Sequence, residues 1–138
     1  MTAHTASRLV VADDEADIRK LVSFILRRHG HTVLEATTGT EAYELIAAER
    51  PDLAILDVMM PGMSGVEVAR RLHQAPGLDA IPVMLLSAKG QAGEVAEGLE
   101  SGATAYIVKP FSPSALAQRV DELLAAAPAD ARRVGDAI

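Results

Sequence analysis

Acidic, hydroxyl and basic side chains follow separate apolar runs of the sequence, at the point where each run ends. Asp13-Asp14-Glu15 follows the first run, and Asp57 follows the third. Ser87 and Lys109 follow the fourth and the fifth. If these runs are parallel strands, their carboxyl ends meet at one edge of the sheet, which is where open α/β sheets bind ligands. We therefore expect three aspartates, a hydroxyl and an ammonium group to converge there.

The carboxylates at this edge suit a divalent cation. Adjacent carboxylates repel one another and raise one another's pKa unless a cation lies between them. Mg²⁺ takes few carboxylates and keeps several waters, which matches Asp13, Asp14 and Asp57. Each residue alone has a plainer interpretation, because aspartates often cap helices, and Ser87 or Lys109 could be an ordinary surface group. Their joint placement favours a functional site.

Length and composition limit the class of protein. The chain has 138 residues, enough for one domain, of which 49% are hydrophobic and 23% charged. Its net charge of −6 gives no general attraction to nucleic acid or anionic lipid, so we expect neither to bind directly. Cysteine is absent, which excludes disulfides, thiolate metal sites and cysteine nucleophiles. The sequence has no apolar run near ~20 residues and no secretory pattern, so we expect a cytoplasmic protein.

Short apolar runs alternate with helical patterns along the chain. Such alternation predicts an α/β fold with a doubly wound (βα)5 arrangement, in which a five-stranded parallel sheet carries helices on both faces. The second run is short and more polar, so we expect it near an edge of the sheet. The five strands are predicted at residues 9–12, 33–34, 53–56, 82–86 and 105–108.

The helix predicted at about residues 91–100 differs from the others. It contains Gly93 and Gly98, each of which costs about 0.5–1 kcal/mol relative to alanine in a helix interior. We therefore expect it to be the least stable helix and the one that repacks most easily. Other helices begin at capping residues, such as Thr38 and Ser112.

Two terminal segments lie outside the alternating pattern. We expect residues 1–7 to be an N-terminal extension and residues 128–138 to be a tail or the start of a linker. Residues 8–127 then form the single domain. The basic pair Arg27-Arg28 is expected to be a solvated helix end. The histidines show no ligand spacing and are expected at the surface: His4, His29, His31 and His73.

Four separated motifs resemble the receiver domain of bacterial two-component response regulators, a chemotaxis-type, flavodoxin-like domain. The resemblance covers about residues 8–127 and implies the strand order 2-1-3-4-5. It also implies a phosphorylation-dependent signalling switch that catalyses only its own phosphoryl transfer and dephosphorylation, rather than an enzyme. The motifs are VVADDE (10–15), LDVMMPGMSG (56–65), LSAK (86–89) and GATAYIVKPF (102–111).

The resemblance implies a role for each polar residue at the edge. Asp57 would accept a phosphoryl group from a histidine kinase or phosphotransfer protein. Mg²⁺, the one cofactor implied, would be held by Asp57, by Asp14 directly and by Asp13 through water. The Met59 backbone carbonyl would be a further metal ligand. Lys109 would bind a phosphoryl oxygen and the Asp57 carboxylate.

Three residues are implied to read the phosphoryl group. The Ser87 hydroxyl and the Ala88 amide would hydrogen-bond it, and the Tyr106 ring would rotate in behind Ser87. This repacking would change binding to a downstream effector protein or a fused output domain. The Lys109-Pro110 peptide bond is implied to be cis.

Four residues depart from the common family pattern: Met59, Lys89, Thr104 and Ala105. Met59 cannot orient an attacking water, and Lys89 could pair with the phosphoryl group or block the approach to it. We therefore expect a comparatively long-lived phosphorylated state. Thr104-Ala105 replaces two acids that form dimer salt bridges in transcription-factor receivers. This departure argues against that symmetric dimer and favours docking to a different partner. We expect the unphosphorylated protein to be a monomer.

Other classes of protein fit parts of the pattern. A metal-dependent phosphatase also uses an aspartate nucleophile, but it needs an acid or base where Met59 stands. A flavin-binding electron carrier shares the strand order, but its first loop cradles a phosphate that Asp13-Asp14-Glu15 would repel. A degenerate receiver could act as an interaction module, although every expected active residue is present. Turnover of a phosphate ester would support the phosphatase, and a coloured protein would support the flavin carrier.

Overall fold

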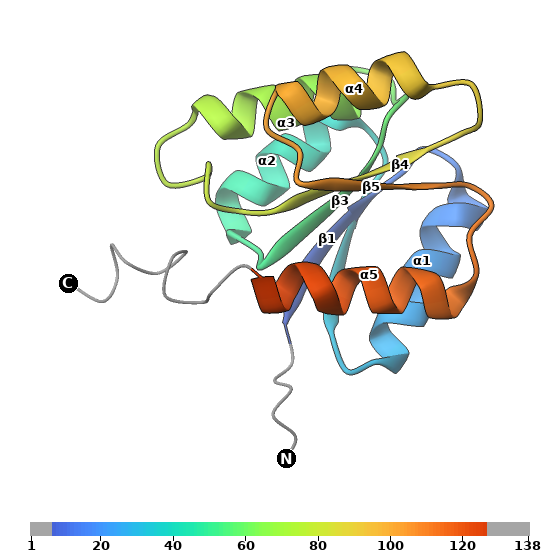
Figure 1. Ribbon diagram of the computed structural model, residues 1–138. Coiled ribbons are helices and arrows are strands. Elements are labelled where there is room, and N and C mark those ends of the chain that lie inside the picture. The colour runs from blue at the N-terminus through green and yellow to red at the C-terminus, as the bar shows by residue number, and fades with distance from the viewer. Residues whose placement is uncertain (1–6, 127–138) are drawn as a thin grey trace.

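The computed structural model describes residues 7–126, where strands and helices alternate strictly. Figure 1 shows the sheet between two helical layers, with α1 and α5 on one face and α2, α3 and α4 on the other. The strands are β1 (Arg8–Ala12), β2 (Thr32–Ala36), β3 (Leu53–Asp57), β4 (Val83–Ser87) and β5 (Ala105–Val108). The helices are α1 (Ala16–Arg28), α2 (Gly39–Glu49), α3 (Gly65–Gln74), α4 (Ala92–Glu100) and α5 (Pro113–Ala126).

All paired strands run parallel, in the order β2-β1-β3-β4-β5. The predicted doubly wound (βα)5 fold with the order 2-1-3-4-5 is therefore confirmed. β2 lies at an edge, as its polar run predicts. β3 and β4 are buried along their whole length because helices cover both faces of the sheet.

Alternate residues of the central strands face two separate apolar cores. Val10 and Leu56 pack in the core with α2 and α3. Val11 and Ile55 pack in the core with α1 and α5. A slip of one residue would exchange the two sets, so the pattern fixes the register. The positions of the residues at the strand ends are fixed with it.

The predicted capping residues begin three helices. The side-chain oxygens of Thr38, Ser64 and Ser112 each accept a hydrogen bond from the main-chain N–H three residues on, at 3.0, 3.1 and 3.1 Å respectively. Each cap satisfies a donor of the first turn that has no partner within its helix. These caps end the preceding loops at defined places.

Of the five helices described, α4 buries the fewest residues, Val95 and Gly98. A Cβ on Gly98 would lie 2.5 Å from Cδ1 of Leu85, so glycine there lets the helix approach the sheet. A Cβ on Gly93 would meet nothing within 4 Å. The sparse burial agrees with the expectation that this helix is weakly held.

The prediction that all four histidines lie at the surface is wrong for His31. This residue is 5% exposed, and its Nδ1 accepts a hydrogen bond from the backbone N–H of Ser7 at 3.3 Å. It is buried because β2 pairs with β1, which brings the residues before the two strands together. His29 and His73 are exposed. His4 lies outside the described residues.

The predicted terminal segments are largely beyond this description. The tail at 128–138 and residues 1–6 of the extension lie outside the described residues, and the domain boundaries stay predictions. Between residues 7 and 126, no helix has the length and apolar character needed to cross a membrane.

Candidate functional site

The carboxyl ends of β1 and β3 bring three aspartates together. Asp13 and Asp14 follow β1, and Asp57 is the last residue of the neighbouring strand β3. Each offers a carboxylate oxygen that lies within 4.8 Å of those of the other two. Asp13 and Asp57 are 0% and 6% exposed, whereas Asp14 is exposed. The expected convergence of acidic groups is therefore present.

The main-chain N–H and C=O of Asp13 are both linked to β2, the N–H directly and the C=O through Arg19. Its N–H donates to the Ala36 carbonyl at 3.2 Å, and its carbonyl accepts a hydrogen bond from the Arg19 guanidinium at 3.0 Å. Arg19 also donates to Glu35 of β2 at 3.0 Å. The Arg19 and Glu35 side chains are only 12% and 22% exposed, so this pair is shielded from solvent. Arg19 thus links the acidic loop to the neighbouring strand.

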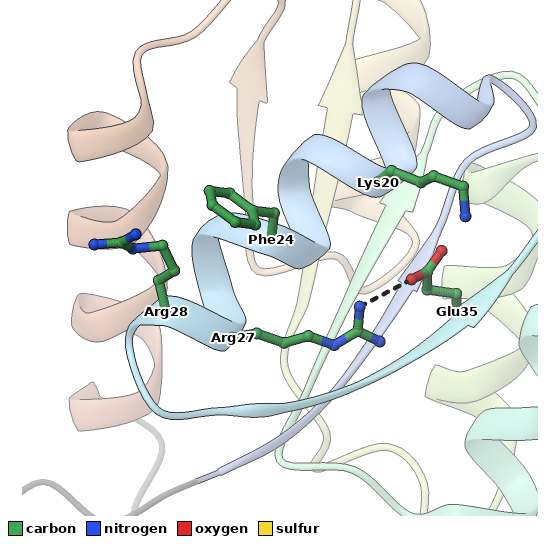
Figure 2. Close-up of a pocket in the computed structure, with 5 residues that line it drawn as sticks. All are labelled: Lys20, Phe24, Arg27, Arg28 and Glu35. Atoms are coloured by element: carbon green, nitrogen blue, oxygen red, sulfur yellow. Dashed lines mark hydrogen bonds and ion pairs between the residues drawn. The ribbon is translucent and has the colours of Figure 1, made fainter.

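Arg27 reinforces the same link from the outer surface (Figure 2). It donates to Glu35 at 3.2 Å and to the Val33 carbonyl at 2.9 Å. Burial opposes the charge of Glu35, but the hydrogen bond from Arg19 and the charges of Lys20 and Arg27 lower its pKa. Arg27 lies in the last turn of α1 and is exposed, as predicted, and its contacts with β2 add a role that the sequence did not indicate.

A hollow at the surface of α1 is lined by Phe24 and Arg28 together with Arg27 and Glu35. In Figure 2, Phe24 and Arg28 extend from α1 on one side of this hollow, and Arg27 and Glu35 lie on its other side. The Arg28 guanidinium lies 5.7 Å from the centre of the Phe24 ring, and Phe24 is 58% exposed. Leu21 is also exposed, at 44%. The helix that begins at the acidic edge therefore presents apolar and cationic groups together.

The loop after β3 holds Asp57 in place. The Val58 N–H donates to the Leu86 carbonyl at 3.0 Å, and the Gly65 N–H donates to the Val58 carbonyl at 2.9 Å. A Cβ on Gly65 would lie 2.2 Å from the Asp57 carbonyl oxygen. Glycine is therefore needed where α3 begins against the end of β3.

Lys109 brings a positive charge to the aspartates from the end of β5. Its Nζ lies 3.0 Å from Asp57 Oδ1 and 3.2 Å from Asp13 Oδ2. An exposed carboxylate oxygen of Glu15 lies 3.3 Å away. The peptide bond between Lys109 and Pro110 is cis, as the resemblance implies.

Burial and like charges set the ionisation of this cluster. Burial raises the pKa of Asp57 to about 6, with the charge of Asp13 adding to the effect and the Lys109 hydrogen bond opposing it. Burial also raises the pKa of Asp13. Burial opposes the charge of Lys109, but the hydrogen bond and charge of Asp57 outweigh it and raise the lysine pKa. The single positive charge of Lys109 therefore does not neutralise the three aspartates.

The donor set fits a small divalent cation. Three carboxylates face one another with a single lysine among them, and the exposed Asp14 leaves room for water ligands. This combination matches the preference of Mg²⁺ for a few carboxylates and retained waters. Asp13, Asp14 and Asp57 are the residues that would hold it. The Met59 side chain is 55% exposed, and the role of its carbonyl stays a prediction.

The other side of the edge consists of the end of β4 and the loop that follows. Ser87 is the last residue of β4 and is 1% exposed, whereas Ala88 and Lys89 are exposed. The Ala88 N–H donates to Oε1 of Gln91 at 2.7 Å. Sequence reasoning did not single out Gln91, because a lone polar residue before a helix indicates little beyond a cap.

Tyr106 lies on the edge strand β5 and is 39% exposed. It pairs with Leu85 in the sheet. Together with Ser87 it lines a hollow of about 300 Å³ that Val95 and Leu99 of α4 also line. The two predicted switch residues therefore border the same space. The rotation of the ring stays a prediction.

Comparison with known proteins decides the family. The family model described as the response regulator receiver domain matches residues 9–121. This chain is a member of that family. The predicted resemblance to receiver domains is thereby confirmed, and the acidic cluster of this receiver corresponds to the place where the family binds Mg²⁺.

Relatives of this receiver domain include larger regulators. The phosphate regulon transcriptional regulatory protein PhoB of Pseudomonas aeruginosa is 42% identical over 116 residues, which are 84% of this chain and 51% of that protein. The DNA-binding response regulator MtrA of Mycolicibacterium paratuberculosis is 41% identical over 113 residues, 82% of this chain and 49% of that protein. The chain thus spans about half the length of these relatives.

Solved structures agree with this assignment. A response regulator from Chloroflexus aurantiacus superposes with a TM-score of 0.83 at 34% identity, covering 88% of this chain and 99% of that one. The chemotaxis response regulator CheY4 of Vibrio cholerae has a TM-score of 0.81 at 31% identity, covering 86% of this chain and 99% of that one. The receiver is therefore similar to a chemotaxis-type domain in fold and to transcriptional regulators in sequence.

Proposed function

We propose that this receiver is a phosphorylation-dependent switch in which Asp57 accepts a phosphoryl group from a histidine kinase or phosphotransfer protein. One observation carries the proposal: the Asp57 carboxylate lies 3.0 Å from Lys109 Nζ and beside two further aspartates. With a pKa of about 6, Asp57 is largely ionised at pH 7 and can act as a nucleophile. The phosphoryl group is transferred to the receiver itself, so the receiver is both the acceptor and the carrier of the signal.

In this transfer an Asp57 oxygen attacks the phosphorus of the donor phosphohistidine. The new phosphorus–oxygen bond forms as the phosphorus–nitrogen bond breaks, and the electron pair of that bond leaves with the imidazole. Lys109 lies beside the attacking carboxylate, where its charge offsets the charge of the phosphoryl oxygens. Mg²⁺ bound by Asp13, Asp14 and Asp57 would supply further positive charge to those oxygens.

Groups at the end of β4 would bind the phosphoryl group on Asp57 and change their packing in response. We propose that Ser87 and the Ala88 N–H hydrogen-bond phosphoryl oxygens, and the hollow that both residues line with Tyr106 supports this. The sparsely buried α4 can repack at low cost, which supports a change of surface on that side. We propose that a downstream effector or a fused output domain recognises this surface. The names of PhoB and MtrA include transcription and DNA binding, which supports gene regulation as the output.

The unphosphorylated receiver is proposed to be a monomer. Thr104, which stands where related transcription-factor receivers carry an acid, accepts a hydrogen bond from the Val83 N–H at 3.2 Å and so serves the sheet of its own chain. Sedimentation velocity with Mg²⁺, with and without beryllofluoride as a phosphoryl mimic, tests this proposal. A dimer without beryllofluoride would contradict it, and a dimer formed only with beryllofluoride would indicate output by self-association.

Binding of beryllofluoride tests the switch itself. In the presence of Mg²⁺, we expect it to bind the wild type and change the Tyr106 fluorescence. Asp57→Asn should abolish binding because beryllofluoride is held through the aspartate oxygen. Equal binding by both proteins, or by neither, would contradict the proposed function.

A further inference from the structure

The N–H that is expected to meet the phosphoryl group already has a partner. The Ala88 N–H donates to Oε1 of Gln91 at 2.7 Å, which is short for a hydrogen bond from nitrogen. An amide N–H carries one proton, so it serves one strong acceptor at a time. We propose that Gln91 is a placeholder that occupies the Ala88 N–H in the unphosphorylated protein and must leave before a phosphoryl oxygen can bind there. This inference rests on the proposed function.

The side chain of Gln91 serves the loop rather than the helix that it precedes. Gln91 is the N-cap residue of α4, but its side chain accepts no hydrogen bond from the amides of the helix. Its backbone N–H donates to the Ala88 carbonyl at 3.2 Å, so two hydrogen bonds join these residues. Gly90, between them, has a φ of +91°, which lets the loop close. Gln91 therefore closes the loop onto the amide that the phosphoryl group needs.

The same residue connects this loop to the proposed switch. The Gln91 carbonyl accepts a hydrogen bond from the Val95 N–H in the first turn of α4, at 3.0 Å. Gln91 also lines the hollow that Ser87 and Tyr106 line. When a phosphoryl oxygen displaces the Gln91 side chain, both the start of α4 and the space beside Tyr106 change. Occupation of Ala88 is thus coupled to the face that partners would recognise.

The competition has a measurable size. A hydrogen bond of this kind shifts an equilibrium by about fivefold. Gln91→Ala and Gln91→Met remove the competing oxygen, and the second variant keeps nearly the full length of the side chain. We expect both to bind beryllofluoride about fivefold more tightly than the wild type at saturating Mg²⁺. Gln74→Ala, at the exposed end of α3, is the matched control and should leave the affinity unchanged.

The Ala88 amide itself gives the decisive readout. In proton–nitrogen NMR spectra of the full chain without beryllofluoride, the Ala88 signal should move upfield in both Gln91 variants. When beryllofluoride is bound, the Ala88 signals of the variants and the wild type should converge, because the phosphoryl mimic is then the acceptor in each. A merely structural role of Gln91 would not predict this convergence.

Three outcomes overturn the placeholder, and the last of them also overturns the proposed function. An Ala88 signal that is the same in the wild type and both Gln91 variants would show that the contact is not formed in solution. Unchanged beryllofluoride affinity in the variants, with normal binding by the wild type, would show that the contact does not compete, and would leave the proposed function intact. Absence of beryllofluoride binding in every protein would overturn the proposed function and the placeholder together.

Discussion

The two sides of the acidic edge hold their polar groups in different ways. On the acid side, which consists of Asp13, Asp14 and Asp57, the N–H, carbonyl and both carboxylate oxygens of Asp13 have partners. On the loop side, residues 87–91, three consecutive residues are exposed, and the side chain of Gln91 closes the loop. Asp13 is fully buried, whereas Gln91 is at the surface and only partly covered.

This difference matches two different tasks. Stabilising charge at a transferring phosphoryl group is most effective when the charged groups need no reorganisation at the moment of reaction. A switch instead needs an element that can change its packing at low cost. We infer that the acid side is preorganised for transfer and that the loop side is adaptable for signalling.

The largest expected effect comes from removing the acceptor charge of Asp57. Its pKa is about 6 in the folded protein and 3.8 ordinarily, so the native state binds a proton more tightly than the unfolded state. The stability that this proton gives is present below pH 3.8 and is lost as the pH rises through 6. In chelator at pH 7, Asp57→Asn should therefore raise the free energy of unfolding by roughly 2–3 kcal/mol, measured with urea.

The pH dependence of that gain separates it from general stabilisation. The difference between Asp57→Asn and the wild type should shrink as the pH falls toward 4. Asp79→Asn, at an exposed aspartate between α3 and β4, should show no comparable gain at pH 7. A variant at Asp57 that is less stable than the wild type at pH 7 would show that the acid side is not under-neutralised.

Breaking the anchor of the acid side should weaken metal binding. Arg19→Gln removes the hydrogen bond to the Asp13 carbonyl, so we expect Mg²⁺ affinity to fall about tenfold, as substitutions next to metal ligands commonly cause. Arg27→Gln is the matched control, because Arg27 shares Glu35 with Arg19 but has no contact with Asp13. Calorimetric titration with Mg²⁺ measures both. Equal losses in the two variants would mean that preorganisation does not depend on the Asp13 contact.

The lifetime of the phosphorylated state should depend on two exposed residues. Met59 cannot orient an attacking water, whereas an asparagine side chain can hydrogen-bond one. Met59→Asn should therefore shorten the lifetime about fivefold, which is the effect of about one hydrogen bond on a rate. Lys89→Ala should also shorten it, if the lysine pairs with the phosphoryl group or blocks the approach to it. Intact-mass measurements at successive times after removal of the donor monitor the loss of phosphate. A wild-type protein that loses phosphate rapidly, and is unaffected by either substitution, would refute the expected long lifetime.

The smallest effect distinguishes the two glycines of α4. Gly93→Ala places a methyl group in open space and should stabilise the protein by about 0.5–1 kcal/mol. Gly98→Ala places one 2.5 Å from Leu85 Cδ1 and should destabilise it. Thermal unfolding measures both. If both substitutions stabilise the protein, α4 does not pack against β4 as described.

The sequence predicted the fold well because its strongest signals are repetitive or local. Apolar runs define the strands, and capping residues such as Thr38 and Ser112 define helix starts. The polar residues at the strand ends then meet because a doubly wound sheet brings its carboxyl ends together. This is why Asp57 and Lys109, 52 positions apart in the printed sequence, could be placed at one site.

The missed features depend on where particular side chains point. No local pattern singles out Arg19 or links Arg27 to β2, but the packing of α1 against β2 directs both to Glu35. His31 is buried by the residue before β1, which no local pattern indicates. Gln91 turns back to Ala88 instead of capping α4, a choice that depends on the loop conformation at Gly90.

One measurement tests the central claim most directly. The full chain is incubated with Mg²⁺ and a small phosphodonor such as acetyl phosphate. Its intact mass is then measured, and peptide mapping locates the modified residue. We predict the addition of one phosphoryl group to the wild type, located on Asp57, and no addition to Asp57→Asn. A wild type that remains unmodified, or modification that persists in Asp57→Asn, would contradict the assignment of Asp57 as the phosphoacceptor.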